Sequence, residues 1–489
     1  MFDKIKQWIG GVWSAMLGKN IIQEKMNVEI AMTTQQSNRI ERWLNIYKGT
    51  PPWLNETTKT MNLGVAIANE FAKLVTIEFK SEIANNDFLN KEYQREVIDN
   101  IRNIVEYACA GGAICFKPYL TNDGHIAVDI VQADNFYPVT FMRGRCTSCI
   151  LPEYVIKGNY TYTRLESHTY DSLTRTYTIT NKAFKIKRYD DIGNPLNNGM
   201  IGDEVALNSI DEWSNLAPNV TFNNIDQPLF VYFAMPFANP QNPYSKLGVS
   251  VYANVADTEG LLEQADKLYS NMLWEYEAKE AAIYADVTMF NHDNKGNQYL
   301  EDGEKRLYKN IDWNSQDSNK PLQEYSPDIR DMSLFNGLNQ LMRKIEFQVG
   351  LAYGTISDTN DTAKTATEIK GSKQRSYQTV KDIQNSLQLA SEQLAYSLYA
   401  WGIIGKQQGL IKEDISPIDI EKDLSFNFDD SIIIDRDSQL DKMFLDVTSG
   451  VLKSIYYIKE KYGVDEKTAK EMIVDQTIVQ PDPFQGTEE

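Results

Sequence analysis

The sequence predicts an α+β fold that combines long, one-faced helices with a strand-rich part, and two patterns lead to this prediction. In the second half, two helical segments flank a short polar loop within residues 329–402. Between residues 121 and 187, apolar and polar positions alternate and β-branched and aromatic residues are frequent, as in strands. Each helical segment has a single apolar stripe, so much of its surface must face water, a ligand or a neighbouring subunit. We therefore expect these helices to form a wall, not a globular core.

The first half of the chain is predicted as helices followed by strands. Apolar residues spaced by three and four predict helices over 27–48, 58–78 and 91–109. Strands follow as far as residue 187, separated by turn signals such as Asn122-Asp123-Gly124. The apolar run at 227–237 is predicted as one more, buried, strand.

The second half is predicted as three long helices with two interruptions. A helix over 249–280 has one apolar stripe and acidic residues on its other faces. Short strands and turns are expected over 281–328, and the polar loop separates the next two helices. Strand alternation returns at 424–434, before at least two helices in 438–475. The acidic residues of the first helix are Asp257, Glu259, Glu263, Asp266, Glu275 and Glu277. Residues expected to pack these helices together are Leu261, Leu268, Met272, Leu334, Leu338, Leu341 and Ile345.

Net charge restricts the partners that the protein can hold. With 68 acidic and 49 basic residues, the formal net charge is −19. A protein that holds nucleic acid statically is usually basic, because neutralised phosphates supply most of the affinity. The charge argues against such a clamp, and it permits a surface along which DNA passes without adhering.

The cysteine count and the hydropathy pattern indicate the cellular compartment in which the protein folds. Four cysteines in 489 residues argue against a disulfide scaffold and favour an intracellular setting. No segment approaches the roughly 20 apolar residues that a membrane-spanning helix needs. The first 17 residues have a one-faced helical pattern, which indicates either a helix at a membrane surface or, the interpretation we favour, one that covers an apolar groove on this chain or a neighbour.

No motif indicates catalysis, a cofactor or a metal. Cys146 and Cys149 have the spacing of a zinc or redox pair, but no second pair completes four ligands, so we interpret them as thiols on a turn. An enzyme built on this pair stays an alternative. Residues 291–296 resemble a calcium loop, yet Lys295 occupies a ligand position, and a β-turn is expected. Phosphate-binding loops and nucleophile elbows are absent from the sequence.

A basic island follows the polar loop. It has a single acidic residue, Glu368, among five basic residues. We expect these basic residues either to contact phosphates transiently or to pair with acidic helices of an adjacent subunit, and we favour the second interpretation. These residues are Lys364, Lys370, Lys373, Arg375 and Lys381.

The order of elements resembles that of the portal proteins of tailed bacteriophages over about residues 25–475. Three stretches add to the resemblance: WLNIYKGTPPW, YACAGGAICFKPYL and TAKTATEIKGSKQRSYQTVKDIQNSL. They are most similar to portals from phages of low-GC Gram-positive hosts. The resemblance implies a mixed α/β wing, a long-helix stem, a small β-containing clip, a tunnel loop followed by a long helix, and a helical crown.

Carried onto this chain, the resemblance implies the following boundaries. An N-terminal helical extension (1–39) precedes the wing (40–246 and 404–437), the stem helices (247–280 and 329–352), the clip (281–328), the tunnel loop (353–364), the long helix (365–403), and the crown with its tail (438–489).

The resemblance also implies a function without catalysis or cofactor. Portals form a homo-oligomeric ring, in the family of 12 copies, at one capsid vertex of the virion. The terminase large subunit drives double-stranded DNA through the ring without sequence specificity, and the DNA is later ejected. Further implied partners are a head–tail adaptor and the major capsid and scaffolding proteins, with assembly in the host cytoplasm and no membrane. The acidic stem helix would repel DNA from the channel wall.

Within this expectation, the polar residues of the tunnel loop touch the DNA. They are Thr355, Ser357, Asp358, Thr359, Asn360, Asp361 and Thr362. The alternative is another ring-forming virion protein, such as a tail or baseplate adaptor, that has no contact with DNA.

Overall fold

A computed structural model describes the backbone of residues 19–189, 201–278, 282–286, 291–292, 298–299, 308–311, 322–325, 330–358, 366–428, 436–462 and 466–472. The chain divides into two units, Met1–Phe428 and Asp429–Glu489, which are described separately. Both helices and largely antiparallel sheets are present, so the predicted α+β class is confirmed. The proposed N-terminal helix over the first 17 residues lies outside the described part.

In its described part, the first unit begins with five helices, and all three helices predicted here have different bounds. The helix expected over 58–78 spans Leu63–Thr76. The helix expected from residue 27 begins at Thr34, because Thr33 and Gln36 form a reciprocal capping box there. The helix expected over 91–109 is divided, since Val97 (φ −121°, ψ −59°) departs from helical geometry. The helices are α1 (Lys19–Met26), α2 (Thr34–Tyr47), α3 (Leu63–Thr76), α4 (Asp87–Glu96) and α5 (Ile101–Gly111).

The predicted strand-rich part forms two antiparallel sheets. The larger has the order β4-β5-β6-β7-β8, with β9 also paired to β7, and the smaller has the order β10-β2-β3. The apolar run at 227–237 contains β10, whose Val231 and Phe233 are buried. The strands are β2 (Ala113–Leu120), β3 (Ile126–Gln132), β4 (Tyr137–Met142), β5 (Arg145–Lys157), β6 (Tyr160–Asp171), β7 (Thr176–Lys187), β8 (Asp203–Val205), β9 (Asn219–Asn223) and β10 (Val231–Ala234).

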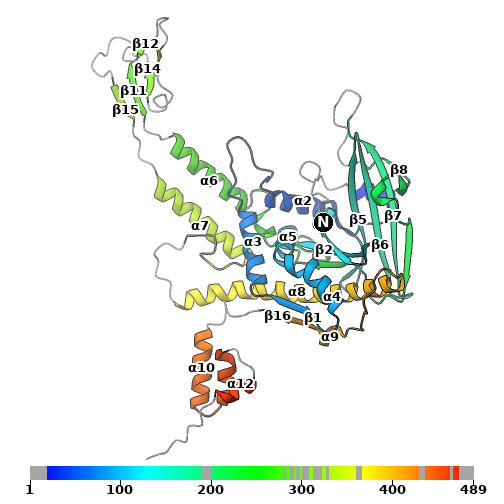
Figure 1. Cartoon of the computed structure of the whole chain (residues 1–489). Helices are drawn as coiled ribbons and strands as arrows, with labels where there is room; N and C mark the ends of the chain where they lie inside the picture. Colours follow the sequence, from blue (N-terminus) through cyan, green and yellow to red (C-terminus); the bar gives the residue numbers. More distant parts are fainter. Residues whose placement is uncertain are drawn as a thin grey trace, which may run out of the picture. The chain divides into compact units, whose positions relative to one another are not determined.

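Two helices, α6 (Leu261–Ala278) and α7 (Asp331–Val349), form an antiparallel pair, here called the α6–α7 hairpin (Figure 1). The strands between them pair in the orders β14-β11-β15 and β12-β13, as the predicted insert of short strands requires. These strands are β11 (Ala282–Asp286), β12 (Asn291–His292), β13 (Gln298–Tyr299), β14 (Tyr308–Ile311) and β15 (Leu322–Tyr325).

The helix predicted from residue 249 begins only at Leu261. The preceding segment is held in a non-helical course, because Val251 N donates to Cys109 O (3.1 Å) and Tyr252 OH donates to Trp43 O (2.9 Å). Glu259 then adopts a left-handed conformation (φ 57°), which a helix cannot contain. Tertiary hydrogen bonds therefore outweigh the helical periodicity of this segment.

The long helix α8 (Ala366–Gln407) contradicts the expectation of a wall. Its predicted apolar stripe is buried in the main hydrophobic core, where the helix packs against α3, α4, β2 and β10. Figure 1 shows it running through the unit beneath these elements. The other faces of α8 keep exposed residues such as Gln378, Asp382 and Leu389. The buried stripe consists of Val380, Ile383, Leu387, Ala390, Leu394 and Leu398.

The chain returns to its beginning after α8. The short helix α9 (Ile420–Asp423) leads into β16 (Leu424–Asn427), which pairs antiparallel with β1 (Lys80–Ile83). Strand alternation predicted at 424–434 is thus confirmed for 424–427, and residues 429–435 lie outside the described part. This pairing places the segment after α8 in the same unit as α3 and α4.

The second unit consists, in its described residues, of three helices. The first ends where Gly450 takes a left-handed conformation (φ 78°), which gives one more helix than the sequence required. The helices are α10 (Arg436–Thr448), α11 (Ser454–Tyr462) and α12 (Glu466–Glu471).

Candidate functional site

The described start of the polar loop after α7 folds back along the helix, since Asp358 hydrogen-bonds with Asn339. Gly350 caps α7 in a left-handed conformation (φ 85°), and Gly354 repeats that conformation (φ 87°). Two such reversals so close together favour glycine, because a Cβ atom is strained there. We call the returning segment, Gly354–Asp358, the loop base.

Glu346 of α7 holds the start of the loop base. Its carboxylate is fully buried and accepts hydrogen bonds from Gly354 N (3.1 Å), Ile356 N (2.7 Å) and Ser357 N (2.8 Å). The Ser357 hydroxyl donates a further bond of 2.7 Å. A buried carboxylate is costly unless donors surround it, and here they come from the loop itself.

Asn339 holds the end of the loop base. Its Oδ1 accepts from Asp358 N (2.8 Å), and its Nδ2 donates to Asp358 O (3.0 Å). Arg343 also donates to Asp358 O (3.2 Å). Asn339 and Glu346 are separated by seven residues, or about two helical turns, so they lie on one face of α7.

The structure locates three of the seven predicted loop residues. Thr355 Oγ1 donates to Ala352 O (2.6 Å), Ser357 is buried with its hydroxyl directed at Glu346, and Asp358 is exposed. Thr359, Asn360, Asp361 and Thr362 lie outside the described residues. Of the located three, Asp358 thus presents its side chain to solvent, and Ser357 does not.

The basic island is described only in part. Lys364 and the side chains of Lys370 and Lys373 lie outside the described part. The Arg375 guanidinium stacks on the ring of Phe347, 3.9 Å from its centroid, and so joins α8 to the end of α7. Lys381 lies 6.0 Å from the ring centroid of Phe428.

The predicted packing residues meet along the α6–α7 hairpin. Leu338 and Ile345 are buried, and the predicted packing residues on α6, such as Leu268, are half-buried against the same core. A Cβ atom at Gly337 would lie 3.8 Å from Leu268 Cδ2, which shows how closely the two helices approach. Leu261, Met272, Leu334 and Leu341 are likewise half-buried.

An ion pair joins the helices at the end nearest the insert. Arg330 Nη2 lies 2.7 Å from Glu275 Oε2, and Arg330 Nε donates to Glu275 Oε1 (3.1 Å). The two contacts make the pair bidentate. Glu275 is only 3% exposed, so its carboxylate belongs to the interior of the protomer.

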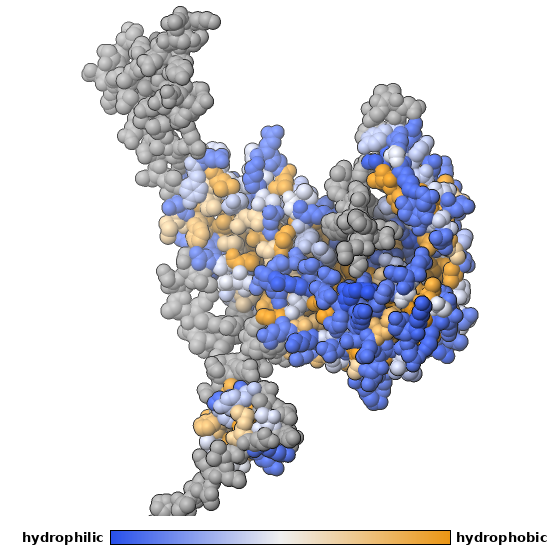
Figure 2. Space-filling model, viewed as in Figure 1, coloured by the Kyte–Doolittle hydropathy of each residue, from blue (hydrophilic) through white to orange (hydrophobic). Residues whose placement is uncertain are grey.

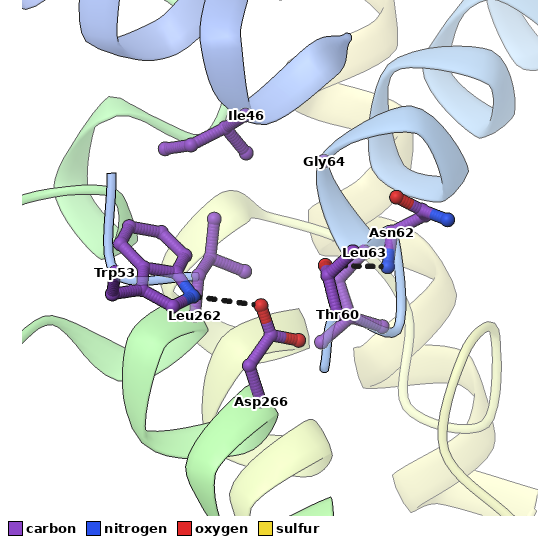
Figure 3. Close-up of a pocket in the computed structure, with 8 residues that line it drawn as sticks. All are labelled: Ile46, Trp53, Thr60, Asn62, Leu63, Gly64, Leu262 and Asp266. Atoms are coloured by element: carbon purple, nitrogen blue, oxygen red, sulfur yellow. Dashed lines mark hydrogen bonds between the residues drawn. The ribbon is translucent and has the colours of Figure 1, made fainter. Parts of the chain in front are cut away.

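The expectation that the acidic residues of the first stem helix repel DNA is wrong for Glu275 and two more of them. Asp266 is buried and accepts from Trp53 Nε1 (2.8 Å) and Met61 N (2.9 Å) (Figure 3). Glu263 is buried beside Lys267, whose hydrogen bond lowers the pKa of that carboxyl. These carboxylates anchor neighbouring segments, a use that amino-acid type and helical spacing do not reveal.

Figure 3 also shows a small hollow beside Asp266, between α6 and the segment that precedes α3. Trp53 and Leu262 close one side, and Thr60 and Leu63 line the other. Its polar groups are already engaged, since Asp266 bonds Trp53 and Asn62 N bonds Thr60 Oγ1 (3.0 Å). The hollow therefore marks a junction between segments.

The cysteine pair lies on strand β5, so the expectation of a turn is wrong. Both thiols are buried, and burial raises the pKa of each, which keeps them protonated and unreactive. Within the described residues, no group of three or more His, Cys, Asp or Glu side chains could hold a metal ion. The calcium-like residues 293–296 lie outside that part. No described helix is long and apolar enough to cross a membrane.

The outer surface of the hairpin is apolar in places and otherwise mainly neutral. Trp274 on α6 is 66% exposed and Met332 on α7 is 67% exposed. Figure 2 shows hydrophobic residues gathered over this hairpin. Exposed amide side chains are distributed along both helices: Gln264, Asn271, Asn336, Gln340 and Gln348.

Sequence reasoning missed Glu346 and Asn339. Both stand beside the apolar stripe of α7, where Leu338, Met342 and Ile345 are buried. A polar residue at a buried helical position must find a partner, and that signal was available in the sequence. The identity of the partner could not be predicted, because it depends on how the loop turns back onto α7.

The comparison with known families concerns nearly the whole chain. Residues 34–472 match the family model described as "Phage portal protein, SPP1 Gp6-like". The matched range begins at the first residue of α2 and includes every later element through α12. No curated protein matches the chain.

Proposed function

Because the chain belongs to the SPP1 Gp6-like family of phage portal proteins, we propose that it forms the channel through which double-stranded genomic DNA is packaged and later ejected. As a portal protein it is a structural, non-enzymatic component of the virion and of the head–tail connector, and portals assemble as oligomeric rings with capsid and DNA. The family match over residues 34–472 supports this function most directly, and it favours a portal over a tail or baseplate adaptor.

The finer parts of the proposal concern partners and copy number. The ring contains 12 copies at one capsid vertex, and the terminase large subunit moves the DNA. The head–tail adaptor binds at the clip, and the major capsid and scaffolding proteins surround the ring, which assembles in the host cytoplasm. Portals of phages from low-GC Gram-positive hosts are the proposed nearest relatives.

The order of the elements supports the proposed segments. Residues 40–246, which include most of α2, α3–α5 and the sheets β4-β5-β6-β7-β8 and β10-β2-β3, form the wing together with 404–437. The α6–α7 hairpin forms the stem, and the strand-containing clip lies between its two helices in the sequence. The tunnel loop includes the loop base, α8 is the long helix that follows, and α10–α12 belong to the crown. An N-terminal extension (1–39) would precede the wing.

The surface of the hairpin suggests how DNA passes without adhering. Its exposed side chains include several amides, and its exposed charged residues, such as Lys267, Glu277 and Lys344, have both signs. Amides do not displace counterions from phosphates, so they add little salt-dependent affinity. We therefore attribute the weak adhesion of DNA to a channel wall of little net charge, and not to the repulsive acidic wall that the sequence indicated.

Electron microscopy of the purified full-length protein tests the proposal. We expect closed rings whose central opening admits a DNA duplex, and packaging reactions with terminase that depend on this protein. A monomer, a closed ring without an opening, or packaging that proceeds in its absence would refute it. A ring with a strongly cationic lumen would refute the channel wall of little net charge.

A further inference from the structure

The carboxylate of Glu346 is unusual because the loop alone satisfies it. Its oxygens receive three backbone N–H groups and one hydroxyl, all from Gly354, Ile356 and Ser357. Within the described residues, no cation forms an ion pair with it. A fully buried charge with such donors is stable only while the loop base stays in place.

Asn339 supplies a second, independent attachment two turns earlier. Its side-chain amide pairs with both the N–H and the C=O of Asp358, as a neighbouring strand would. The side chain is buried, so these bonds are shielded from competing water. The two attachments direct the loop base along α7, back towards the insert.

We infer that Glu346 and Asn339 are positioning residues that attach the loop base to α7, so that Gly354–Asp358 of the proposed tunnel loop move with α7. The importance of this attachment for DNA passage rests on the proposed function. Arg330 and Glu275 join the other end of α7 to α6, next to the clip strands. A shift of the hairpin at the clip would therefore carry the loop base with it.

Hydrogen–deuterium exchange of the full-length ring tests the attachment. Glu346→Gln retains the size of the side chain but leaves one oxygen for three N–H donors. We expect exchange at Ile356 and Ser357 to become at least tenfold faster, while α8 is unchanged. Asn339→Ala should do the same at Asp358. Glu277→Gln, an exposed substitution of the same kind on α6, should change neither.

DNA packaging by the same rings separates this inference from the proposed function. Faster exchange together with reduced packaging or retention supports both. Faster exchange with normal packaging supports the inferred attachment but refutes the role of the loop in handling DNA. Unprotected amides at Ile356 and Ser357 in the unmodified ring, or unchanged exchange in Glu346→Gln and Asn339→Ala, would overturn the inference. The measurement on the unmodified ring decides the matter even if a variant does not fold.

Discussion

The indole N–H of Trp53 donates a 2.8 Å hydrogen bond to the carboxylate of Asp266, although 213 residues separate the two. The same carboxylate accepts from Met61 N. One side chain of α6 therefore holds the segment between α2 and α3 against the proposed stem. A residue that composition would assign to the charged surface instead joins two distant parts of the protomer.

Replacing Asp266 with alanine should destabilise the protomer by about 2–3 kcal/mol, because the buried indole N–H of Trp53 and the half-buried N–H of Met61 lose a charged acceptor. Urea denaturation at one fixed protein concentration measures this change. Asn271→Ala, at an exposed position of the same helix, should change the free energy of unfolding by less than about 0.5 kcal/mol. Equal effects of the two substitutions would contradict the role of the hydrogen bonds.

Leu338 and Leu341 should differ in cost when each is truncated to alanine. Leu338 is buried and Leu341 is half-buried, so we expect about 2–4 kcal/mol for Leu338→Ala and clearly less for Leu341→Ala. Leu338→Asp should prevent folding or ring assembly, since it places a charge in the helix interface. Thermal unfolding and negative-stain microscopy measure these effects, with Gln340→Asp as the exposed control. Intact rings from Leu338→Asp would show that the hairpin register is wrong.

Glu166 should make stability depend on pH below neutrality. Burial alone would raise the pKa of its carboxyl, but Lys117, Arg164 and His168 outweigh burial and hold the pKa well below the ordinary value of 4.5. The carboxylate lies 2.9 Å from Arg164 and 3.3 Å from Lys117. A depressed folded pKa stabilises the fold above the unfolded pKa, and this stabilisation is lost as pH falls through the folded value.

We therefore expect Glu166→Gln to cost about 3–5 kcal/mol at pH 7, because it leaves the buried Arg164 and the largely buried Lys117 with less compensation. The difference from the unmodified protein should stay constant down to about pH 5 and shrink below the unfolded pKa near 4.5. Denaturation curves at several pH values measure it. Glu70→Gln, which removes a partly exposed pair with Lys73, should cost at most about 1 kcal/mol. A difference that grows on acidification would refute the assignment.

Trp274 should stabilise the ring more than the protomer. Its side chain is 66% exposed in the single chain, and large exposed aromatics often contribute strongly to an interface once a neighbour covers them. We expect Trp274→Ser to leave the unfolding free energy within about 0.5 kcal/mol but to raise the concentration needed for ring formation. Sedimentation velocity measures the latter. Tyr244→Ser, at a 92% exposed loop position, serves as the control, and equal assembly of both variants would exclude Trp274 from the interface.

Much of the element order could be predicted, because it depends on local periodicity. Three-and-four spacing correctly predicted the apolar stripe of α8. Alternation correctly predicted the strands up to residue 187 and the strand-containing insert. The boundaries were less accurate wherever tertiary contacts compete with propensity. Residues 249–256 have a helical pattern, yet hydrogen bonds to Cys109 and Trp43 hold them in another conformation.

The candidate site could be predicted only in outline. Its position after α7 follows from the polar composition and the glycines of the loop. The attachment of Ser357 to Glu346 could not be predicted, because it depends on a chain reversal at Gly350 and Gly354. The interior role of Asp266 likewise depends on a partner that is distant in sequence.

Periodicity and composition thus established the fold class and the order of the helices and strands, because these properties repeat over short distances along the chain. The resemblance to portals rested on that order and on three stretches of sequence. The folded chain alone decided which carboxylates point inward, that α8 lies in the core, and that the loop base is held on α7. Such decisions depend on which distant groups meet, and the free energy of burying a charge depends on that meeting.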